Sequence, residues 1–575
     1  MRSRLLTWLP PLLAVLPAAA YAETPRDHLL RLVPPDVGFC FVVQDLRRHS
    51  ESFLASAFVK QFRASPVGVA LAKDPDMQKL ARADKELEKY LRVGWPRLRD
   101  DIFGDAVVFA YRPGPPGKRE QEQGVMLVEA RDAKLLAELV DRVNAVQKKA
   151  GDLKDVEVHK HKGAAYYRRV ERKGVNFYYL HGPVLAFSRQ EEMLRHVIEL
   201  DRQAAAKEPP LVSRQLSRCG ADRDLAVWWI NPPAFVPDLE EQATQSSGAE
   251  STLHKAMLAY WKPLEGITLS AAVHRNDLEL KLVLLARQKE LPETVRHLFA
   301  GKAQASELWR RFPSHAILAV AGRVDGVALG ELVSGFLTPE ARTRLREAVD
   351  RGAGAALGKE VGKEVVPFLG PDWGFCVVAP PAVEKALVPE MLWALRVRPD
   401  GKVPPVDQAL LNALNTFAML AVFSYNSANA DQISLKTAVE DKTEVKYLAS
   451  NKRFAPGFQP AFALKDGYLL LAGSPGAIRR FNGASTSTGP VLPAGEIPLL
   501  RFSVRELRTF LKDRIEPLAA QLAGKQGLSK EEAQRHLRDL IRSSELVERV
   551  DVNQRAAPGL VAFMLRVHTA APVQK

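Results

Sequence analysis

Short apolar runs, many of them alternating with polar residues and separated by tight turns, recur along the whole 575-residue chain. In residues 460–481 two such runs flank Asp466-Gly467, and Ser474-Pro475 follows the second run. Asp-Gly between apolar runs is typical of a type I′ hairpin, because both central residues of that turn need positive φ. Serine caps a helix and proline fits its first position. The segment predicts strand, turn, strand and helix.

The same order of elements recurs in residues 176–197. Here the pattern predicts a turn at His181-Gly182, and Ser188 with Glu191 forms an S-x-x-E capping box at the start of a helix. Two hairpin-and-helix units of one design indicate an internal duplication.

Three further elements recur in the order of the first copy, at offsets between 266 and 279 residues, and the hairpin recurs at an offset of 285 residues. Four matched elements in one order predict two tandem-duplicated lobes, residues 23–300 and 301–575. The further matched elements begin at Pro34 and Pro313, at Ile102 and Phe368, and at Leu225 and Leu499.

Within each half, period-two runs predict strands and 3.6-residue spacing predicts helices. Hairpins outnumber strand–helix–strand crossovers, so the predicted fold class is α+β, with two lobes that each form a mainly antiparallel sheet covered on one face by helices. Polar segments 237–252 and 483–498 are predicted loops. Predicted strands are 125–130, 175–180, 267–274, 278–286, 433–439 and 560–567, and predicted helices are 133–149, 340–351, 406–419 and 530–546.

The first 22 residues carry two arginines, an apolar stretch broken by prolines, and Ala20-Tyr21-Ala22 before Glu23. This pattern predicts a signal peptide cleaved after Ala22, and therefore an exported protein, periplasmic or extracellular. The alternative is a retained anchor, although the apolar stretch is short for a span. We expect no transmembrane span after cleavage, because the most apolar later segment, residues 409–423, contains two asparagines.

The formal net charge is +14, and removal of Arg2 and Arg4 leaves +12. The partners that a basic exported protein meets are an anionic envelope polymer, a membrane surface or an envelope protein, and nucleic acid is not expected. A solvated basic surface that binds nothing specific is the alternative.

Three cysteines are too few for a disulfide framework in a chain of this length. Cys40 and Cys376 lie in apolar runs, where a free thiol behaves as a small buried hydrophobe. One disulfide among Cys40, Cys219 and Cys376 stays open in an oxidising compartment.

Ala472-Gly473-Ser474-Pro475-Gly476 resembles a nucleophile elbow on a strand-to-helix turn. The elbow requires a backbone N–H after the serine, and Pro475 has none, so we interpret Ser474 as a helix cap. No catalytic residue is assigned.

His159 and His161 share one face of a predicted strand and, with His181, suggest a metal site. No acidic or cysteine residue falls at a supporting spacing, and two lysines flank the pair. Phosphate-loop and dinucleotide fingerprints are absent from the sequence. We predict no metal and no cofactor.

Basic residues recur every three or four positions in two predicted helices near the C-terminus. Two such stripes suit a polyanion or an anionic headgroup surface, and the alternative is the solvated face of an amphipathic helix. The predicted polyanion-binding residues are Arg501, Arg505, Arg508, Lys512, Arg535, Arg538 and Arg542.

Aromatic residues at Trp228-Trp229, Tyr260-Trp261 and 177–179 could line a sugar-binding cleft, but a place in the core is the favoured interpretation for all of them. Neighbouring strand residues point to opposite faces, so one of each pair belongs to the core.

The hairpin at Lys465–Ile478 and the opening at Val33–Leu46 resemble motifs of a family of large secreted bacterial proteins of unknown function. The resemblance implies repeated strand–turn–strand–helix units and carries no activity. The second lobe departs from the opening motif, because Ser314-His315 replaces its Pro-x-Asp.

Two functions therefore stay open. The first is an exported, non-enzymatic scaffold or binding protein of the cell envelope. The alternative is a hydrolase of envelope polymers with a site between the lobes, which converging carboxylates with shifted pKa values would favour.

Overall fold

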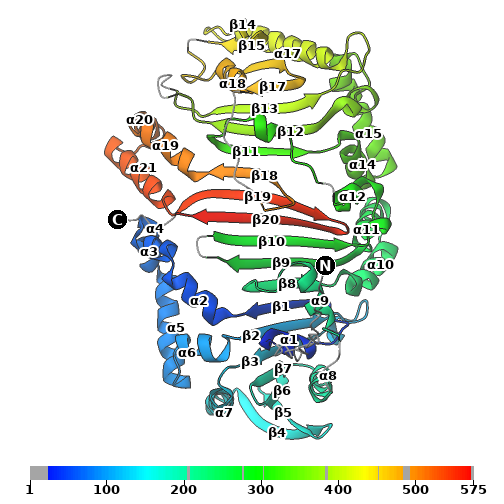
Figure 1. The fold of residues 1–575 in the computed structure, drawn as a ribbon, viewed down its shortest axis with the longest axis vertical. Coiled ribbons are helices and arrows are strands. Elements are labelled where there is room, and N and C mark those ends of the chain that lie inside the picture. The colour runs from blue at the N-terminus through cyan, green and yellow to red at the C-terminus, as the bar shows by residue number, and fades with distance from the viewer. Residues whose placement is uncertain are drawn as a thin grey trace, which may run out of the picture.

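A computed structural model describes residues 24–203, 208–274, 277–301, 303–381, 386–450, 452–482 and 493–570. They form an α+β fold built on one large antiparallel sheet, which runs the length of the molecule (Figure 1). The predicted signal peptide lies outside the described residues. The predominance of hairpins explains why every pairing is antiparallel.

The first half of the chain contributes ten adjacent strands in the order β4-β5-β6-β7-β3-β2-β1-β8-β9-β10. Their bounds are β1 Phe39–Gln44, β2 Ala106–Arg112, β3 Gln123–Glu129, β4 Leu153–His161, β5 Ala164–Glu171, β6 Gly174–His181, β7 Val184–Ser188, β8 Ala226–Ile230, β9 Leu264–Val273 and β10 Asp277–Ala286.

The second half repeats this order as β14-β15-β16-β17-β13-β12-β11-β18-β19-β20. Each strand therefore has a counterpart ten numbers higher. The bounds are β11 Ala316–Arg323, β12 Leu369–Val378, β13 Glu390–Val397, β14 Ser434–Glu440, β15 Thr443–Ala449, β16 Ala461–Lys465, β17 Tyr468–Ala472, β18 Glu496–Ser503, β19 Val547–Ala557 and β20 Leu560–Thr569.

The two halves meet through β10 and β20, which pair antiparallel with Leu280 opposite Leu565 and Leu282 opposite Phe563. The sheet is thereby continuous across the middle of the molecule (Figure 1). The halves share one sheet, whereas the sequence predicted a separate sheet for each.

The predicted turn at Asp466-Gly467 is confirmed, since both residues have positive φ, 52° and 76°. The other predicted turn was wrong by one residue. His181 pairs with Val184, so the central residues are Gly182 and Pro183. Gly182 has φ 57°, and proline cannot follow with a positive φ, so the chain makes a turn of the II′ kind there.

The helix start at Ser474 is confirmed, because its hydroxyl accepts the Ala477 N–H at 3.1 Å at the start of α18 (Pro475–Arg480). The predicted capping box at Ser188 was wrong. Ser188 ends β7 and donates to the Gly124 carbonyl at 2.7 Å, and Gln190 precedes α8 (Glu191–Arg202). The Ser188 hydroxyl oxygen accepts the Gln190 N–H at 3.0 Å, and the helix begins after Gln190, two residues later than the capping box requires.

One face of the sheet is covered by short helices that bury its alternate residues. These helices are α1 (Pro25–Arg31), α8 and α9 (Leu211–Arg218) in the first half, and α13 (Leu308–Arg311) and α18 in the second. Cys40, Val42 and Trp229 lie beneath the first group, and Cys376 and Leu392 beneath the second. This face holds the main cores.

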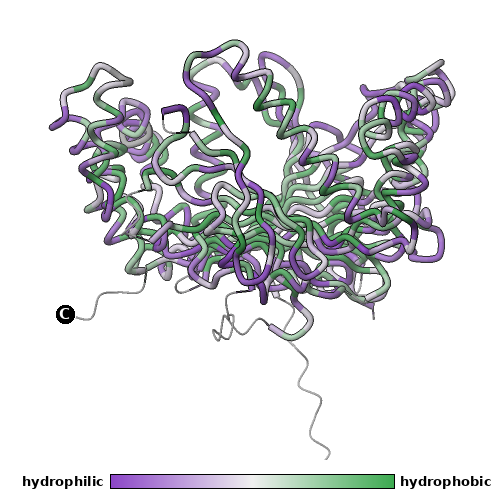
Figure 2. Tube along the Cα trace, turned by 90° about the horizontal axis from the view of Figure 1, so that it is seen from above, coloured by the Kyte–Doolittle hydropathy of each residue, from purple (hydrophilic) through white to green (hydrophobic). Residues whose placement is uncertain are grey.

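Other helices rise along both sides of the opposite face (Figure 2). One side, wall A, consists of α2 (Leu46–Ala55), α3 (Ala57–Ala64), α4 (Pro66–Ala72), α5 (Pro75–Leu91), α19 (Val504–Asp513), α20 (Ile515–Gln526) and α21 (Lys530–Ser544). The other side, wall B, consists of α10 (Val236–Gln245), α11 (Gly248–Trp261), α14 (Gly326–Gly335) and α15 (Pro339–Val349). Two further helices pack on this face at its opposite ends, α7 (Ala133–Ala150) and α17 (Val406–Ala428).

Residues 237–252, predicted as a loop, form most of α10 and the start of α11. Pro237 sits in the first turn of α10, where its missing N–H costs nothing, and Ser246-Ser247-Gly248 separates the two helices. In the other predicted loop, 483–492 lie outside the described residues, while β18 begins at Glu496. The predicted helix 406–419 continues to Ala428.

At the centre of the covered face, charged residues hold the junction between the halves. Arg566 on β20 donates to Glu279 on β10 at 2.6 Å, and to Glu496 on β18 at 2.5 and 2.7 Å. The Glu496 and Glu279 side chains are largely buried. Its hydrogen bonds to Glu496 and Glu279 raise the pKa of Arg566, which keeps the guanidinium charged.

We expect Arg566→Met to lower the free energy of unfolding by about 3 kcal/mol or more, because it leaves two buried carboxylates without their partner. Denaturant titration measures the loss. The matched control is Arg505→Met, which removes an exposed ion pair with Glu506 and should change stability by about 0.5 kcal/mol or less. Equal effects of the two changes would contradict this role of Arg566.

Candidate functional site

The sheet face between walls A and B is apolar and open. Its strands expose large side chains by 36% to 52%, although hydrophobic residues of that size usually lie buried in strands. We call this surface the apolar floor. Its exposed members are Phe41, Phe109, Met126, Trp228, Leu269, Leu280, Leu282, Trp373, Met391, Trp393 and Leu471.

Register places these residues in continuous rows across the strands. One row runs through Met126, Phe109, Phe41, Trp228, Leu269, Leu282 and Phe563. Another runs through Leu471, Trp393, Phe375, Val320, Leu500, Val552, Leu565 and Leu280. Adjacent members are directly opposite each other, so the apolar surface is unbroken from one half of the chain to the other.

The floor carries no charge over its central part. From β3 to β20, through β2, β1, β8, β9 and β10, the described residues on this face are apolar, aromatic or glycine, apart from Thr569 at the end of β20. Antiparallel strands with a solvated face normally place polar residues there. With strands about 4.8 Å apart, the twenty-stranded sheet is roughly 90 Å long.

The walls add apolar side chains to the same side of the molecule. Val67 and Val69 of α4 are exposed in wall A, and Met257 of α11 with Leu329 of α14 are exposed in wall B. In Figure 2 hydrophobic segments follow the sheet, while hydrophilic segments are prominent on the outer parts of the helices. The sheet and its walls therefore form a trough with an apolar floor.

The two walls differ in charge. The wall A segments 46–91 and 504–544 each carry nine Lys and Arg against six Asp and Glu. The wall B segments 236–261 and 326–349 together carry four Lys and Arg against seven Asp and Glu. One side of the trough is basic and the other mildly acidic.

The predicted polyanion-binding residues fall into two groups. Arg501 on β18 faces Asp551 at 3.3 Å, Arg508 donates to Glu548 at 3.0 Å, and Lys512 lies 3.3 Å from Glu545. Arg505 is exposed beside Glu506. These four have acidic partners inside the protein and are not one bare stripe.

The second group is Arg535, Arg538 and Arg542 on α21, all exposed and without an ion pair in the described part of the chain. The opposite side of α21 packs on α20 through Ala533 and Leu537. These three arginines belong to wall A.

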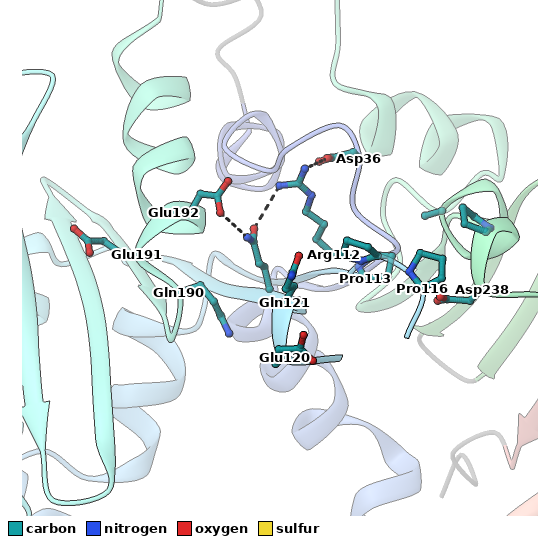
Figure 3. A pocket seen from close by; sticks show the side chains of 15 residues that line it. Asp36, Arg112, Pro113, Pro116, Glu120, Gln121, Gln190, Glu191, Glu192 and Asp238 are labelled. Carbon is teal, nitrogen blue, oxygen red and sulfur yellow. Dashed lines mark hydrogen bonds and ion pairs between the residues drawn. The ribbon is translucent and has the colours of Figure 1, made fainter. Parts of the chain in front are cut away.

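A separate cavity of about 730 Å³ is lined by five carboxylates and lies on the first half (Figure 3). Arg112 faces Asp36 at 2.6 Å and donates to Gln123, which in turn donates to Glu192 at 3.0 Å. Hydrogen bonds from Tyr166 and Arg195 lower the pKa of the Glu191 carboxyl. A general acid needs a raised pKa, so Glu191 does not fit that role.

The histidines considered as metal ligands do not converge. His159 faces Glu157 at 3.3 Å, His161 faces Glu199 at 2.8 Å, and His181 faces Asp201 at 2.8 Å. Among the residues that the structure describes, no three His, Cys, Asp or Glu side chains gather as metal ligands do.

Ser474 lies in the interior, accepting from Ala477 and donating to Glu390 at 2.5 Å. The three cysteines are buried and unpaired, and burial raises the pKa of Cys40 and brings that of Cys376 to about 12. Neither feature supplies an accessible nucleophile.

The aromatic pair on β8 divides as its alternation predicts, with Trp229 buried and Trp228 on the floor. The sequence reasoning missed the floor as a whole. It could have been found from β1 (FCFVVQ) and β8 (AVWWI), which carry apolar residues at odd and even positions and therefore on both faces of the sheet.

Comparison with known proteins yields no family model and no curated protein that matches this chain. The resemblance to a secreted bacterial family therefore stays a prediction. Solved structures of TP0453, in its crystal forms I, III and IV, align with 44–47% of this chain and 79–82% of theirs. Their sequence identity is 11–12% and the TM-scores are 0.22–0.23.

We expect Ser474→Ala to lower the free energy of unfolding by about 1 kcal/mol, because the first turn of α18 loses its cap. Thermal or denaturant unfolding measures this. Ser334→Ala, which removes an exposed hydroxyl bonded within α14, is the control and should be nearly neutral. A neutral Ser474→Ala would show that the cap contributes nothing.

Proposed function

We propose that this protein is an exported, non-enzymatic binding protein of the cell envelope, and that its ligand is an anionic amphiphile with long hydrocarbon chains. The observation that carries the proposal is the uncharged apolar floor. Soluble monomers rarely expose contiguous apolar patches above a few hundred Å², and larger ones mark binding sites. Rows of apolar residues across thirteen of the strands exceed that size.

Hydrocarbon chains suit the floor better than sugars or peptides do. A sugar or a peptide needs hydrogen-bond partners from the site, and the central floor positions supply almost none. A chain that covers Trp228, Leu269 and Leu282 removes their exposed area from water at roughly 25 cal/mol per Å².

The charge difference between the walls supports an anionic head. Wall A has the excess of Lys and Arg, and Arg535, Arg538 and Arg542 form no ion pair in the described part of the chain. A negative headgroup over this wall, with its chains on the floor, satisfies both surfaces. A membrane surface also presents anionic headgroups and hydrocarbon chains, so it remains a proposed partner.

We also infer that the chain arose by tandem duplication, with the boundary near residue 300. The support is the repeated order of ten strands in each half, and the equivalent places of the β6–β7 and β16–β17 hairpins. In this view each half supplies half of the floor.

The floor is tested with a fluorescent fatty acid, dansyl-undecanoate, titrated into the mature protein. Trp393→Glu should weaken binding about tenfold or more, equivalent to roughly 1.4 kcal/mol, because it places a carboxylate among the chains. The control is Trp95→Glu, since Trp95 is equally exposed, 49% against 52%, and lies outside the floor strands. Equal affinities of wild type and Trp393→Glu would refute the proposed ligand site.

Export is tested by expressing the full chain and determining the N-terminus of the accumulated protein. We expect it to begin at Glu23, because Ala20-Tyr21-Ala22 fits the signal peptidase. Recovery of a chain that keeps residues 1–22 would contradict the localisation.

A further inference from the structure

Helix α17 exposes an apolar surface that the floor does not include. Its residues 408–428 contain no charged side chain. Val406, Ala409 and Ala413 are buried against the end of the sheet, but the later turns expose large apolar side chains. Phe417, Leu420 and Phe423 are 54%, 58% and 74% exposed.

The position of α17 in the fold does not require this surface. Its counterpart is α7, which follows β3 as α17 follows β13 and packs at the other end of the same face. Helix α7 contains six charged residues, whereas α17 contains Asp407 alone. A helix at this position can therefore carry many charged side chains, whereas α17 carries almost none.

By length and composition, α17 is the one helix in the described ranges that is long and apolar enough to cross a membrane. Its contacts oppose a crossing. The side chain of Asn426 pairs with both the N–H and the carbonyl of Ile433, and Asn415 accepts from Lys446 at 3.1 Å. The first turns are buried in the protein, so the helix is held to the fold along its length.

The exposed surface is too small for a stable second copy. With about 200 Å² for each large apolar side chain, Phe417, Met419, Leu420 and Phe423 offer roughly 450–500 Å². A stable protein interface needs about 800 Å² from each partner. Interfacial helices bury an apolar face of this kind at the boundary between the headgroups and the acyl chains of a bilayer.

Charges beside the helix favour an anionic bilayer. Lys446 touches the helix through Asn415, and Arg453 lies 5.7 Å from the ring of Tyr425. The neighbouring acids are Asp431, which accepts a hydrogen bond from the Tyr425 hydroxyl at 3.0 Å, and Glu444, which lies 3.8 Å from Lys446. Arg453, between β15 and β16, has no ion pair in the described part of the chain, so it is a cation beside α17 that can meet lipid headgroups.

We propose that α17 docks the protein on an anionic lipid bilayer, with Phe417, Leu420 and Phe423 inserted at the boundary between headgroups and acyl chains. The N-terminal turns of α17 pack on Leu469, next to the floor residue Leu471 on β17. Docking thus places one end of the trough at the membrane. The inference stands on α17 itself and does not require that the floor binds lipid.

The test is flotation of the mature protein with vesicles of equal parts phosphatidylglycerol and phosphatidylethanolamine, compared with pure phosphatidylcholine. The triple change Phe417→Ser, Leu420→Ser and Phe423→Ser should reduce partitioning about tenfold or more. Control changes are Leu345→Ser and Leu540→Ser, which alter similarly exposed residues on α15 and α21. Wild-type flotation of the triple variant, or an equal loss in the controls, overturns the proposal.

If the triple variant folds poorly, a second measurement tests the proposal without it. An environment-sensitive dye on Phe423→Cys should shift to the blue with these vesicles and be quenched by lipids labelled in the upper acyl chain, while a dye on Tyr90→Cys should not respond. The native cysteines are buried and do not compete for the dye. A dye at position 423 that does not respond would show that α17 meets no partner. A blue shift that needs no vesicles and grows with protein concentration would show that α17 meets a second copy. Either result overturns the proposal of a bilayer.

Dansyl-undecanoate binding separates this proposal from the proposed function. The triple change should leave the affinity of the floor unaltered, because none of its residues lies on the floor. Loss of vesicle docking with intact fatty-acid binding supports the role of α17 alone, and the reverse result contradicts it.

Discussion

The architecture depends on the antiparallel pairing of β10 with β20. This pairing joins ten strands from each half into one sheet, and without it each half would present an unpaired edge. Arg566 fixes the junction on the covered face through Glu279 and Glu496, while Leu280, Leu282 and Phe563 continue the apolar rows on the other face. The same strand pair therefore supplies both the mechanical link and the middle of the floor.

The two faces of the sheet serve different purposes. The covered face is filled by α1, α8 and α9 and by α13 and α18, so its apolar residues are accounted for by the core. The opposite face is as apolar, yet its helices stand at the sides and the ends. A sheet that is hydrophobic on both faces normally has both covered, and this difference makes the floor a candidate for an external ligand.

Local structure followed from local chemistry in the sequence. The type I′ turn at Asp466-Gly467 and the cap at Ser474 are set by residues within a few positions, and both were predicted. The errors were shifts of one or two residues. After Ser188 the strand ends and the helix begins two residues later, behind Gln190, and at Gly182-Pro183 proline shifts the turn by one residue.

The pairing of distant segments was harder to predict from the sequence. Nothing local to β10 indicates that β20, almost three hundred residues later, is its partner. The basic residues at Arg501, Arg508 and Lys512 read as a bare stripe because their partners Asp551, Glu548 and Glu545 come from a later segment. The floor was hidden for a similar reason, since a doubly apolar strand such as β8 looks the same whether one face or both are covered.

The most direct test of the account is photo-crosslinking of the mature protein with a fatty acid that carries a diazirine along its chain. If the trough holds hydrocarbon, the labelled peptides will come from the floor strands β1, β8, β9, β10 and β13, and unlabelled fatty acid will suppress them. Labelling confined to the helices or to the covered face, or labelling that excess fatty acid leaves unchanged, would contradict the central claim.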